Sequence, residues 1–103
     1  MINTVVLQGR LTSTPELRKT PNGVSVCSFV LACDDRSGSE KRTDFISCVA
    51  WRATADFINK YFTKGLLIAV DGRLVSRSYE KDGVKRYVTE VLIETAHFCE
   101  RKT

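Results

Sequence analysis

The sequence predicts an all-β fold in a single domain, and three observations lead to this prediction. Its 103 residues are enough for one modest hydrophobic core and too few for two ordinary domains. Most of the chain alternates apolar and polar residues with the period of two that strands show. Helical spacing of apolar residues occurs in one short stretch, residues 54–65. We therefore expect residues 1–103 to form one β-rich domain with a single helix.

Two strands are predicted in the first third of the chain. Residues 3–11 alternate, and one face carries the apolar positions Val5, Leu7, Gly9 and Leu11. Residues 12–23 contain both prolines and end in Pro-Asn-Gly, so we expect a turn-rich connection. Residues 24–35 are rich in β-branched and aromatic residues, and one face carries Cys27, Phe29, Leu31 and Cys33. The polar stretch 36–42 (RSGSEKR) then indicates an exposed hairpin loop.

The third predicted strand, residues 44–53 (DFISCVAWRA), is unusual because both of its faces are apolar. One face carries small core-type residues: Ile46, Cys48 and Ala50. The other face carries Phe45, Ser47, Val49 and Trp51, the last being the one tryptophan of the protein. A barrel needs one apolar face from each strand. The two aromatic residues on the second face therefore need another explanation.

The second half of the chain contains the helix and two more strands. In residues 54–65 helical spacing is shown by Phe57, Ile58, Tyr61 and Phe62, with Thr54 or Asp56 near the start and Gly65 as a stop. Residues 66–79 and 86–98 return to strand. The Asp82-Gly83 pair predicts a two-residue hairpin turn, which would place Tyr79 opposite Arg86 and Glu80 opposite Lys85. This order fits a five-stranded OB-fold barrel with one short helix between strands 3 and 4. A small β-sandwich is the alternative, but it gives no reason for a helix at this point.

The fourth predicted strand suggests what the exposed aromatic residues do. Its core face carries Ile68, Val70, Gly72 and Leu74, and its other face carries Arg73, Val75, Arg77 and Tyr79. Unpaired bases stack on flat aromatic side chains while cations neutralise phosphates. This combination favours binding of single-stranded nucleic acid. The ordinary alternatives are packing for Phe45, a solvated strand face for Arg73 and Arg77, and a subunit contact for Trp51 and Tyr79.

Composition and reactive residues argue against other classes of function. A net charge of +4 permits a polyanionic partner without establishing one. The four cysteines form no CxxC pair, and His97 is the one histidine, so we expect reduced thiols, no metal site and no Cys/His nucleophile pair. The carboxylates that merit inspection for catalysis are Asp34, Asp35 and Asp71; the first two are expected to open an exposed loop, and Asp71 has no histidine or second acid near it in the sequence. With no signal-peptide pattern or membrane-length apolar run, a cytoplasmic location is expected.

Three segments resemble the bacterial and phage single-stranded DNA-binding proteins. They are VVLQGRLTSTPELRKTPNGVSVCSFVLA, DFISCVAW and KGLLIAVDGRLVSRSYEKDGVKRYVTEV, in the order of the family, and the likeness covers the chain from Val5 to about Phe98. The resemblance implies an OB barrel, usually assembled as a homotetramer. It also implies binding of single-stranded DNA with little sequence preference, in replication, recombination and repair, without cofactor or catalysis.

The binding positions of the family can be placed on this sequence. Its aromatic positions fall on Phe45, Trp51 and Tyr79, and its basic positions on Arg18, Lys64 and Arg77. Strand geometry and charge add three further candidates for DNA binding: Arg10, Arg73 and Arg86.

The chain departs from the family in two places. Some members have another stacking aromatic after the second strand, where this chain has Asp-Asp-Arg-Ser-Gly; Arg36, Lys41 and Arg42 are candidates for phosphate contacts there instead. Typical members also continue into a long segment with an acidic tip that recruits replication and repair proteins, whereas this chain ends in a basic stretch. It is either a core domain without its tail or a naturally short phage or mobile-element member.

The leading hypothesis is therefore a non-sequence-specific protein that coats single-stranded DNA as a homo-oligomer, on the family's example a tetramer. The apolar run Leu66, Leu67, Ile68, Ala69 and Val70 exceeds what one small barrel needs to bury, which also favours subunit contacts. The second hypothesis is a tailless primosome-type OB accessory protein that acts in replication restart. An enzyme is the third.

Overall fold

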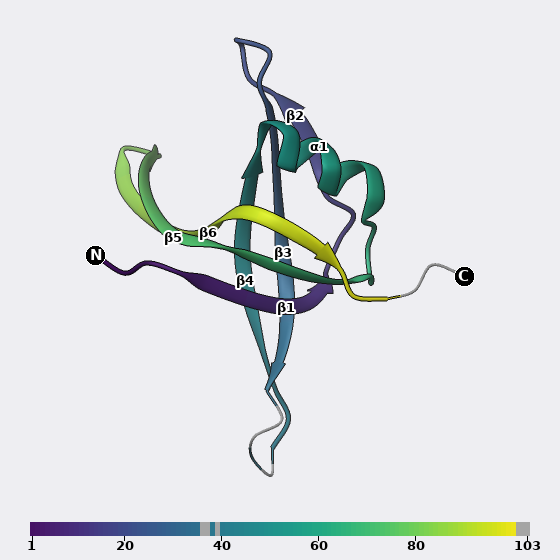
Figure 1. Cartoon of the computed structure of the whole chain (residues 1–103). Helices are drawn as coiled ribbons and strands as arrows, with labels where there is room; N and C mark the ends of the chain where they lie inside the picture. The colour runs from purple at the N-terminus through teal and green to yellow at the C-terminus, as the bar shows by residue number, and fades with distance from the viewer. Residues whose placement is uncertain (36–37, 39, 101–103) are drawn as a thin grey trace.

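The computed structural model describes residues 1–35, 38 and 40–100, which form six strands and one helix (Figure 1). In chain order the elements are β1 (Val5–Leu11), β2 (Glu16–Lys19), β3 (Ser25–Asp35), β4 (Arg42–Trp51), α1 (Arg52–Tyr61), β5 (Leu67–Lys81) and β6 (Val84–Phe98). No helix in the described part of the chain is both long and apolar enough to cross a membrane.

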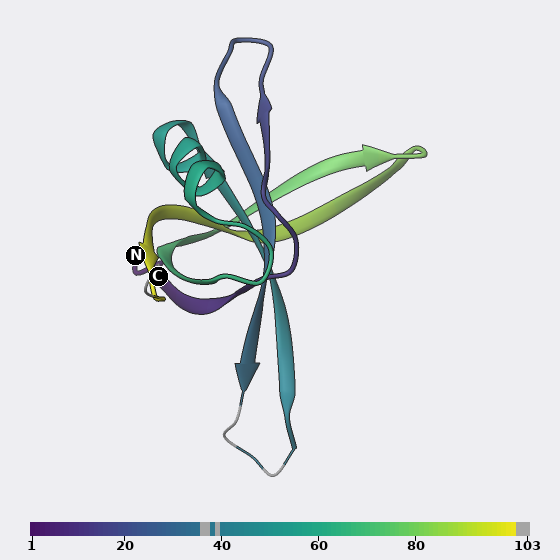
Figure 2. The same cartoon turned by 90° about the vertical axis from the view of Figure 1, so that its right-hand side faces the viewer.

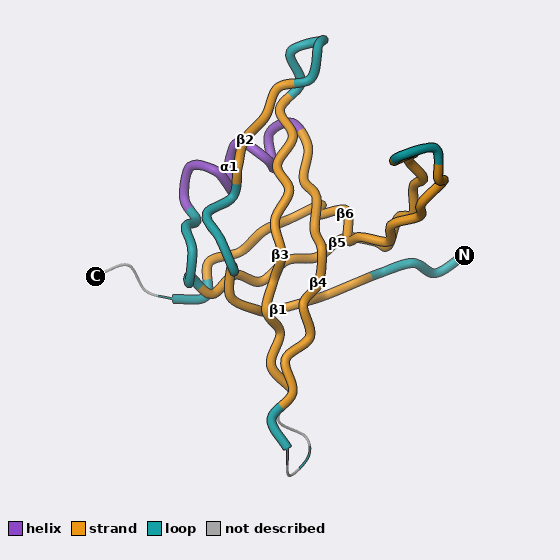
Figure 3. Tube along the Cα trace, turned by 180° about the vertical axis from the view of Figure 1, so that it is seen from behind, coloured by secondary structure: helices purple, strands orange, loops and turns teal. Residues whose placement is uncertain are grey.

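Five of these strands close into a barrel. The sheet order is β1-β5-β6-β4-β3-β2, and a further pairing of β1 with β3 closes the ring. The closing contact is short, joining Arg10 to Ala32 and Leu11 to Leu31, and β4 meets β6 in a parallel pairing at Cys48 and Val91. From the front and from behind, β3 and β4 run across β1, β5 and β6 (Figure 1 and Figure 3). The predicted OB-fold barrel, with one short helix before the fourth of its five strands, is confirmed.

The core lies where the alternation of the sequence predicts it. On β3, Cys27, Phe29 and Leu31 are at most 4% exposed, and on β4, Cys48 and Ala50 are at most 1% exposed. The helix covers one end of the barrel with two fully buried residues, Ala55 and Ile58, and Phe62, directly after the helix, is buried there too. Since these faces supply the core, the opposite faces of β3, β4, β5 and β6 are free for other roles.

One expectation was wrong between residues 12 and 23, where β2 lies within the predicted connection. Its residues pair with β3, from Glu16 opposite Ser28 to Lys19 opposite Ser25. A tight turn joins the two strands, with the Gly23 N–H donating to the Thr20 carbonyl over 2.8 Å and Gly23 at φ +80°. Four residues are too few to show a clear alternation, and β2 is a strand because β3 offers it backbone partners.

The helix also begins earlier than predicted. It starts at Arg52, directly after β4, so Ala53 belongs to the helix and not to the strand. Thr54 does not cap it, because its hydroxyl donates to the Glu94 carbonyl over 3.4 Å. The helix ends at Tyr61, and the left-handed Gly65, at φ +89°, lies in the loop that follows.

The predicted turn of the last hairpin is confirmed, and its strands leave the barrel as an arm. Tyr79 pairs with Arg86 and Glu80 with Lys85 around the Asp82-Gly83 turn. We define the arm as residues 73–81 of β5 and 84–92 of β6; it projects from the barrel in Figure 2. It begins at a bulge between Asp71 and Gly72, where β5 passes so close to β6 that a Cβ at Gly72 would collide with the Leu92 carbonyl. Leu74, predicted on the core face, is 48% exposed because its strand has left the barrel.

Candidate nucleic-acid interface

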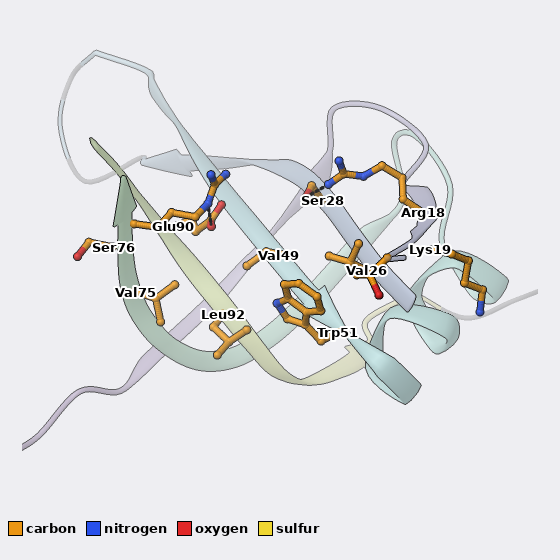
Figure 4. Close-up of a pocket in the computed structure, with 12 residues that line it drawn as sticks. Arg18, Lys19, Val26, Ser28, Val49, Trp51, Val75, Ser76, Glu90 and Leu92 are labelled. Atoms are coloured by element: carbon orange, nitrogen blue, oxygen red, sulfur yellow. Dashed lines mark hydrogen bonds and ion pairs between the residues drawn. The ribbon is translucent and has the colours of Figure 1, made fainter. Parts of the chain in front are cut away.

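Five strands line up their outward residues to form a groove. Strand pairing places Arg18 of β2 beside Val26 of β3, and Val26 beside Trp51 of β4. Further along, Val49 of β4 lies beside Leu92 of β6. These residues, together with Lys19, Ser28, Val75, Ser76, Arg77 and Glu90, surround a hollow of about 620 Å³, which we call the Trp51 groove (Figure 4).

Trp51 has the exposure expected of a binding residue. It is the last residue of β4 and remains 43% exposed, although Val26 and Val49 beside it are nearly buried. Figure 4 shows its indole in the middle of the groove, with Val26 on one side and Leu92 on the other. The ring is therefore supported by aliphatic side chains and open to solvent, which is what stacking on an unpaired base requires.

Two arginines stand on opposite walls of the Trp51 groove. Arg18 donates to the Ser28 hydroxyl over a long 3.4 Å, and Arg77 donates from Nε to Glu90 Oε1 over 2.8 Å. The Arg77 side chain is nevertheless 58% exposed, while the Glu90 side chain is 9% exposed. The fold thus brings the predicted residues Arg18, Trp51 and Arg77 together from three strands.

Glu90 is a groove residue that the sequence interpretation missed. It belongs to the pattern RYVTEV, in which Arg86, Val88 and Glu90 share one face of β6. Glu90 lies opposite Val75 and diagonal to Arg77, so the alternation of β6, followed across the hairpin, could have placed it beside that arginine.

Phe45 and Tyr79 extend the exposed aromatic surface beyond the groove. Phe45 is 67% exposed on the β3–β4 hairpin, paired with Ala32, and does not line the Trp51 groove. Tyr79 is 43% exposed on the arm, and the Arg77 guanidinium lies over its ring at 5.9 Å. Arg86 lies directly opposite Tyr79, as predicted. Tyr79 therefore lies next to Arg77, on the same face of the arm, and extends the exposed surface of the Trp51 groove along the arm.

Tyr87 is a second exposed aromatic residue of the arm and was not among the predicted site residues. It is 74% exposed and pairs with Ser78, so it lies on the opposite face of the arm from Tyr79. The Lys85 ammonium lies over its ring at 5.6 Å. An exposed aromatic next to a cation was the signal that could have identified it.

Besides Arg86 on the arm, three predicted basic residues do not line the Trp51 groove. Arg10 is held elsewhere, since its Nη1 donates to the Gly65 carbonyl and to Glu100 Oε1, each over 3.0 Å. Lys64 is exposed in the loop after the helix, where its backbone N–H donates to the Thr14 hydroxyl. Arg73 lies on the groove face of β5 opposite Leu92, but its guanidinium is 3.9 Å from Glu94.

The β3–β4 loop offers mixed charge. Arg36 lies outside the described residues, while Lys41 and Arg42 line a small hollow of about 250 Å³ together with Asp34, Asp35 and Thr43. Arg42 is 3.0 Å from Asp44 Oδ1. The carboxylates of Asp34 and Asp35, and the Arg42–Asp44 ion pair, therefore offset much of the positive charge of Lys41 and Arg42, which were predicted to contact phosphates.

The carboxylates considered for catalysis have ordinary surroundings. Asp34 accepts a hydrogen bond from the Thr43 hydroxyl over 2.8 Å. Asp71 has a histidine partner that its sequence neighbourhood did not reveal, because pairing of β5 with β6 brings His97 Nε2 to 3.1 Å from its Oδ2. Among residues 1–35, 38 and 40–100, no group of three or more His, Cys, Asp or Glu side chains could hold a metal ion.

Comparison with known proteins agrees with this geometry. Residues 2–99 match the profile of the Single-strand binding protein family. The chain is 50% identical over 104 residues to the "Single-stranded DNA-binding protein" of Bacillus cereus, covering 97% of this chain and 61% of that protein. It is 49% identical to "Single-stranded DNA-binding protein A" of Bacillus subtilis, covering 99% of this chain and 62% of the relative.

A third relative, "Single-stranded DNA-binding protein 1" of Staphylococcus aureus, is 49% identical, with 99% of this chain and 64% of the relative covered. The chain thus spans a little over three fifths of the length of these relatives. The matched family is a DNA-binding family rather than an enzyme family. Since its profile covers nearly every residue of the barrel and the groove, this chain belongs to the Single-strand binding protein family.

Proposed function

We propose that this protein binds single-stranded DNA without sequence specificity and coats it during replication, recombination and repair. The observation that carries the proposal is the Trp51 groove, in which an exposed indole lies between Arg18 and Arg77. The names of the relatives support the same ligand. Every base has a π face, so stacking on Trp51 tolerates any sequence, while the two arginines pair with phosphates that carry no sequence information.

Phe45 and Tyr79 are proposed as further stacking positions along the same strand of DNA. Phe45 and Trp51 share one face of β4 and are six residues apart, about 20 Å along a strand. This distance is too long for a clamp on one base and suits two separate bases of an extended strand. Arg86 and Arg73 are proposed as weaker phosphate contacts at the arm and its base, whereas Arg10 and Lys64 would contact DNA only where it leaves the groove.

A homo-oligomer, on the family's example a tetramer, is proposed for the assembled form. Apolar side chains with no cover on the barrel and arm support it: Val6, Leu66 and Leu74 are 74%, 37% and 48% exposed. Four free cysteines, of which Cys27 and Cys48 are buried, support a cytoplasmic location. Replication or repair proteins are proposed as further partners, and a primosome-type accessory role in replication restart remains the second candidate function. We propose no catalytic activity.

The test is a titration with oligo-dT that follows Trp51 fluorescence. We expect quenching on binding, and Trp51→Ala should weaken binding, measured by anisotropy of labelled oligo-dT, by about 1 to 3 kcal/mol. Folding should change little because Trp51 lies outside the core. The mass in solution, with and without oligo-dT, reports assembly in the same samples. Equal affinity for duplex and single-stranded DNA, or unchanged binding by Trp51→Ala, would contradict the proposed site. A strictly monomeric mass at micromolar concentration would contradict the proposed oligomer.

A further inference from the structure

Arg52, the residue after Trp51, has a backbone conformation that arginine rarely adopts. Its φ is +57°, in the left-handed region, although it is the first residue of α1. The other described non-glycine residue with positive φ is Asp82, which occupies a two-residue hairpin turn where this conformation is ordinary. Glycine reaches the left-handed region without steric cost, whereas a residue with a Cβ does not. A strained backbone at an exposed arginine is a reason to ask what its side chain does.

Contacts within the chain do not supply that reason. Arg52 is exposed, and no hydrogen bond or ion pair joins its side chain to another residue of the described structure. Asp56 follows four residues later on the same helix, yet the two form no ion pair there. The guanidinium group is therefore available to a ligand.

The surroundings of Arg52 indicate which ligand would fit. Arg52 lines a hollow of about 290 Å³, the Arg52 hollow, with Lys19, Gly23, Val24, Ser25, Ala53 and Asp56. Lys19 also lines the Trp51 groove, so the two hollows lie on either side of one lysine. In Figure 4, Lys19 lies on the side of Trp51 away from Leu92. Lys19 Nζ donates to the Ser25 hydroxyl over 2.8 Å, which places its charge at this junction.

Strand pairing explains why these two cations come together. Lys19 of β2 pairs with Ser25 of β3, and the next residue, Val26, pairs with Trp51 of β4. Arg52 thus follows the last paired residue of β4, one step beyond the tryptophan and next to the Lys19–Ser25 pair. Two positive side chains, Lys19 and Arg52, therefore line the Arg52 hollow next to the end of β4. One carboxylate, Asp56, also lines this hollow and reduces its positive charge.

We infer that Arg52 and Lys19 bind the phosphodiester backbone of the DNA strand where it passes beyond the base stacked on Trp51. The inference rests on the proposed function and adds a phosphate site to it. Arginine is suited to this role because its guanidinium pairs with two phosphate oxygens at once. The charges of both side chains act on the phosphates, which makes the contribution independent of base sequence and dependent on salt.

The test replaces Arg52 by glycine, which suits the backbone and removes the charge. We expect Arg52→Gly to raise the melting temperature by about 4 °C, since glycine relieves the left-handed strain. The same variant should bind oligo-dT about 3- to 10-fold more weakly, the loss expected for one charge-assisted contact. The slope of log K against log salt should become shallower by about 0.7 for the lost phosphate contact.

Two matched variants complete the experiment. Arg52→Lys keeps the charge but loses the paired guanidinium donors, so it should keep the wild-type salt slope and bind more tightly than Arg52→Gly. Lys60→Ala removes one positive charge from the same helix outside both hollows and should leave affinity and slope unchanged. Asp56→Asn should strengthen binding, because it removes the carboxylate from the Arg52 hollow.

Three outcomes would overturn the inference while leaving the proposed function intact. The first is wild-type affinity and salt slope for Arg52→Gly. The second is an equal loss of binding by Lys60→Ala, which would indicate general charge rather than a site. The third is a lower melting temperature of Arg52→Gly with a binding loss that Arg52→Lys shares, which would give Arg52 a structural role. Failure of the wild type itself to bind oligo-dT would instead refute the proposed function.

Discussion

Arg77 has two partners in the unbound protein, and both affect how it would meet DNA. Its Nε donates to the nearly buried Glu90 carboxylate over 2.8 Å, and its guanidinium lies over the Tyr79 ring. The Glu90 pairing uses one donor and orients the group, while more than half of the side chain stays in solvent. A guanidinium held in this way keeps free N–H groups for a phosphate.

Arg77→Ala is predicted to weaken both binding and folding. Loss of a phosphate contact should make the slope of log K against log salt shallower by about 0.7. Loss of the partner of Glu90 should lower the free energy of unfolding by about 1 kcal/mol, less than for a fully buried pair because Arg77 is half in solvent. Salt titrations with oligo-dT and urea unfolding measure the two effects.

The double variant Arg77→Ala with Glu90→Gln separates these two roles. Glutamine removes the unpaired charge from the groove, so the double variant should regain stability but not DNA binding. Unchanged affinity and salt slope in Arg77→Ala would remove Arg77 from the binding site.

At the scale of elements, the arm carries an aromatic residue and a cation on each of its faces. Tyr79 shares the face of Arg77, which lines the Trp51 groove, while Tyr87 and Lys85 occupy the other face. The two tyrosines are exposed, and each has a cation less than 6 Å from its ring. The two tyrosines are therefore similar in exposure to solvent and in having a nearby cation, but they lie on opposite faces of the arm.

Tyr79→Ala is predicted to weaken oligo-dT binding by about 1 to 3 kcal/mol, because it removes a stacking surface that continues the groove. Tyr87→Ala should change the affinity by less than about 0.5 kcal/mol. Both variants should unfold at nearly the wild-type temperature because neither ring belongs to the core. Fluorescence anisotropy of labelled oligo-dT measures the binding, and a larger loss in Tyr87→Ala would show that DNA follows the opposite face of the arm.

At the scale of the whole molecule, the barrel core contains two thiols that must stay neutral. Burial raises the pKa of Cys27 from 9.0 to about 11 and that of Cys48 to about 12. Well below pH 9 the thiols are almost entirely neutral in the folded and the unfolded chain alike, so they make little pH-dependent difference to stability. As the pH rises from 9 towards 12, the unfolded chain loses these protons first, and the folded state becomes less stable.

These thiols are therefore predicted to leave the melting temperature nearly unchanged from pH 7.5 to 8.5 and to lower it above pH 9. Each thiol should contribute about 1 to 2 kcal/mol to the loss by pH 10.5. Thermal unfolding followed by circular dichroism at each pH measures it. The variant Cys27→Ala with Cys48→Ala, although less stable at pH 7.5, should show a smaller alkaline decrease; an equal decrease would assign the effect to other groups.

Alternation along β3 and β4 predicted most of the core, although Val49, on the non-core face, is buried and Leu74 of β5, on the predicted core face, is exposed. Cys27, Phe29 and Leu31 are buried, and Phe45 and Trp51 are exposed, as the period of two requires. The Asp82-Gly83 turn was also predictable, because two residues in the left-handed region determine the register of the whole arm. These features are local, so neighbouring residues alone determine them.

The tertiary structure decided which strands become neighbours, and this determines the site. Arg18, Trp51 and Arg77 lie around one hollow because β2 pairs with β3, β3 with β4, β4 in parallel with β6, and β6 with β5. Alternation tells which face a residue occupies but not which strand lies beside it, since strand partners are chosen by the closing of the barrel. The left-handed Arg52 has the same origin: β4 ends there, and the chain must turn at once for the helix to cover the core.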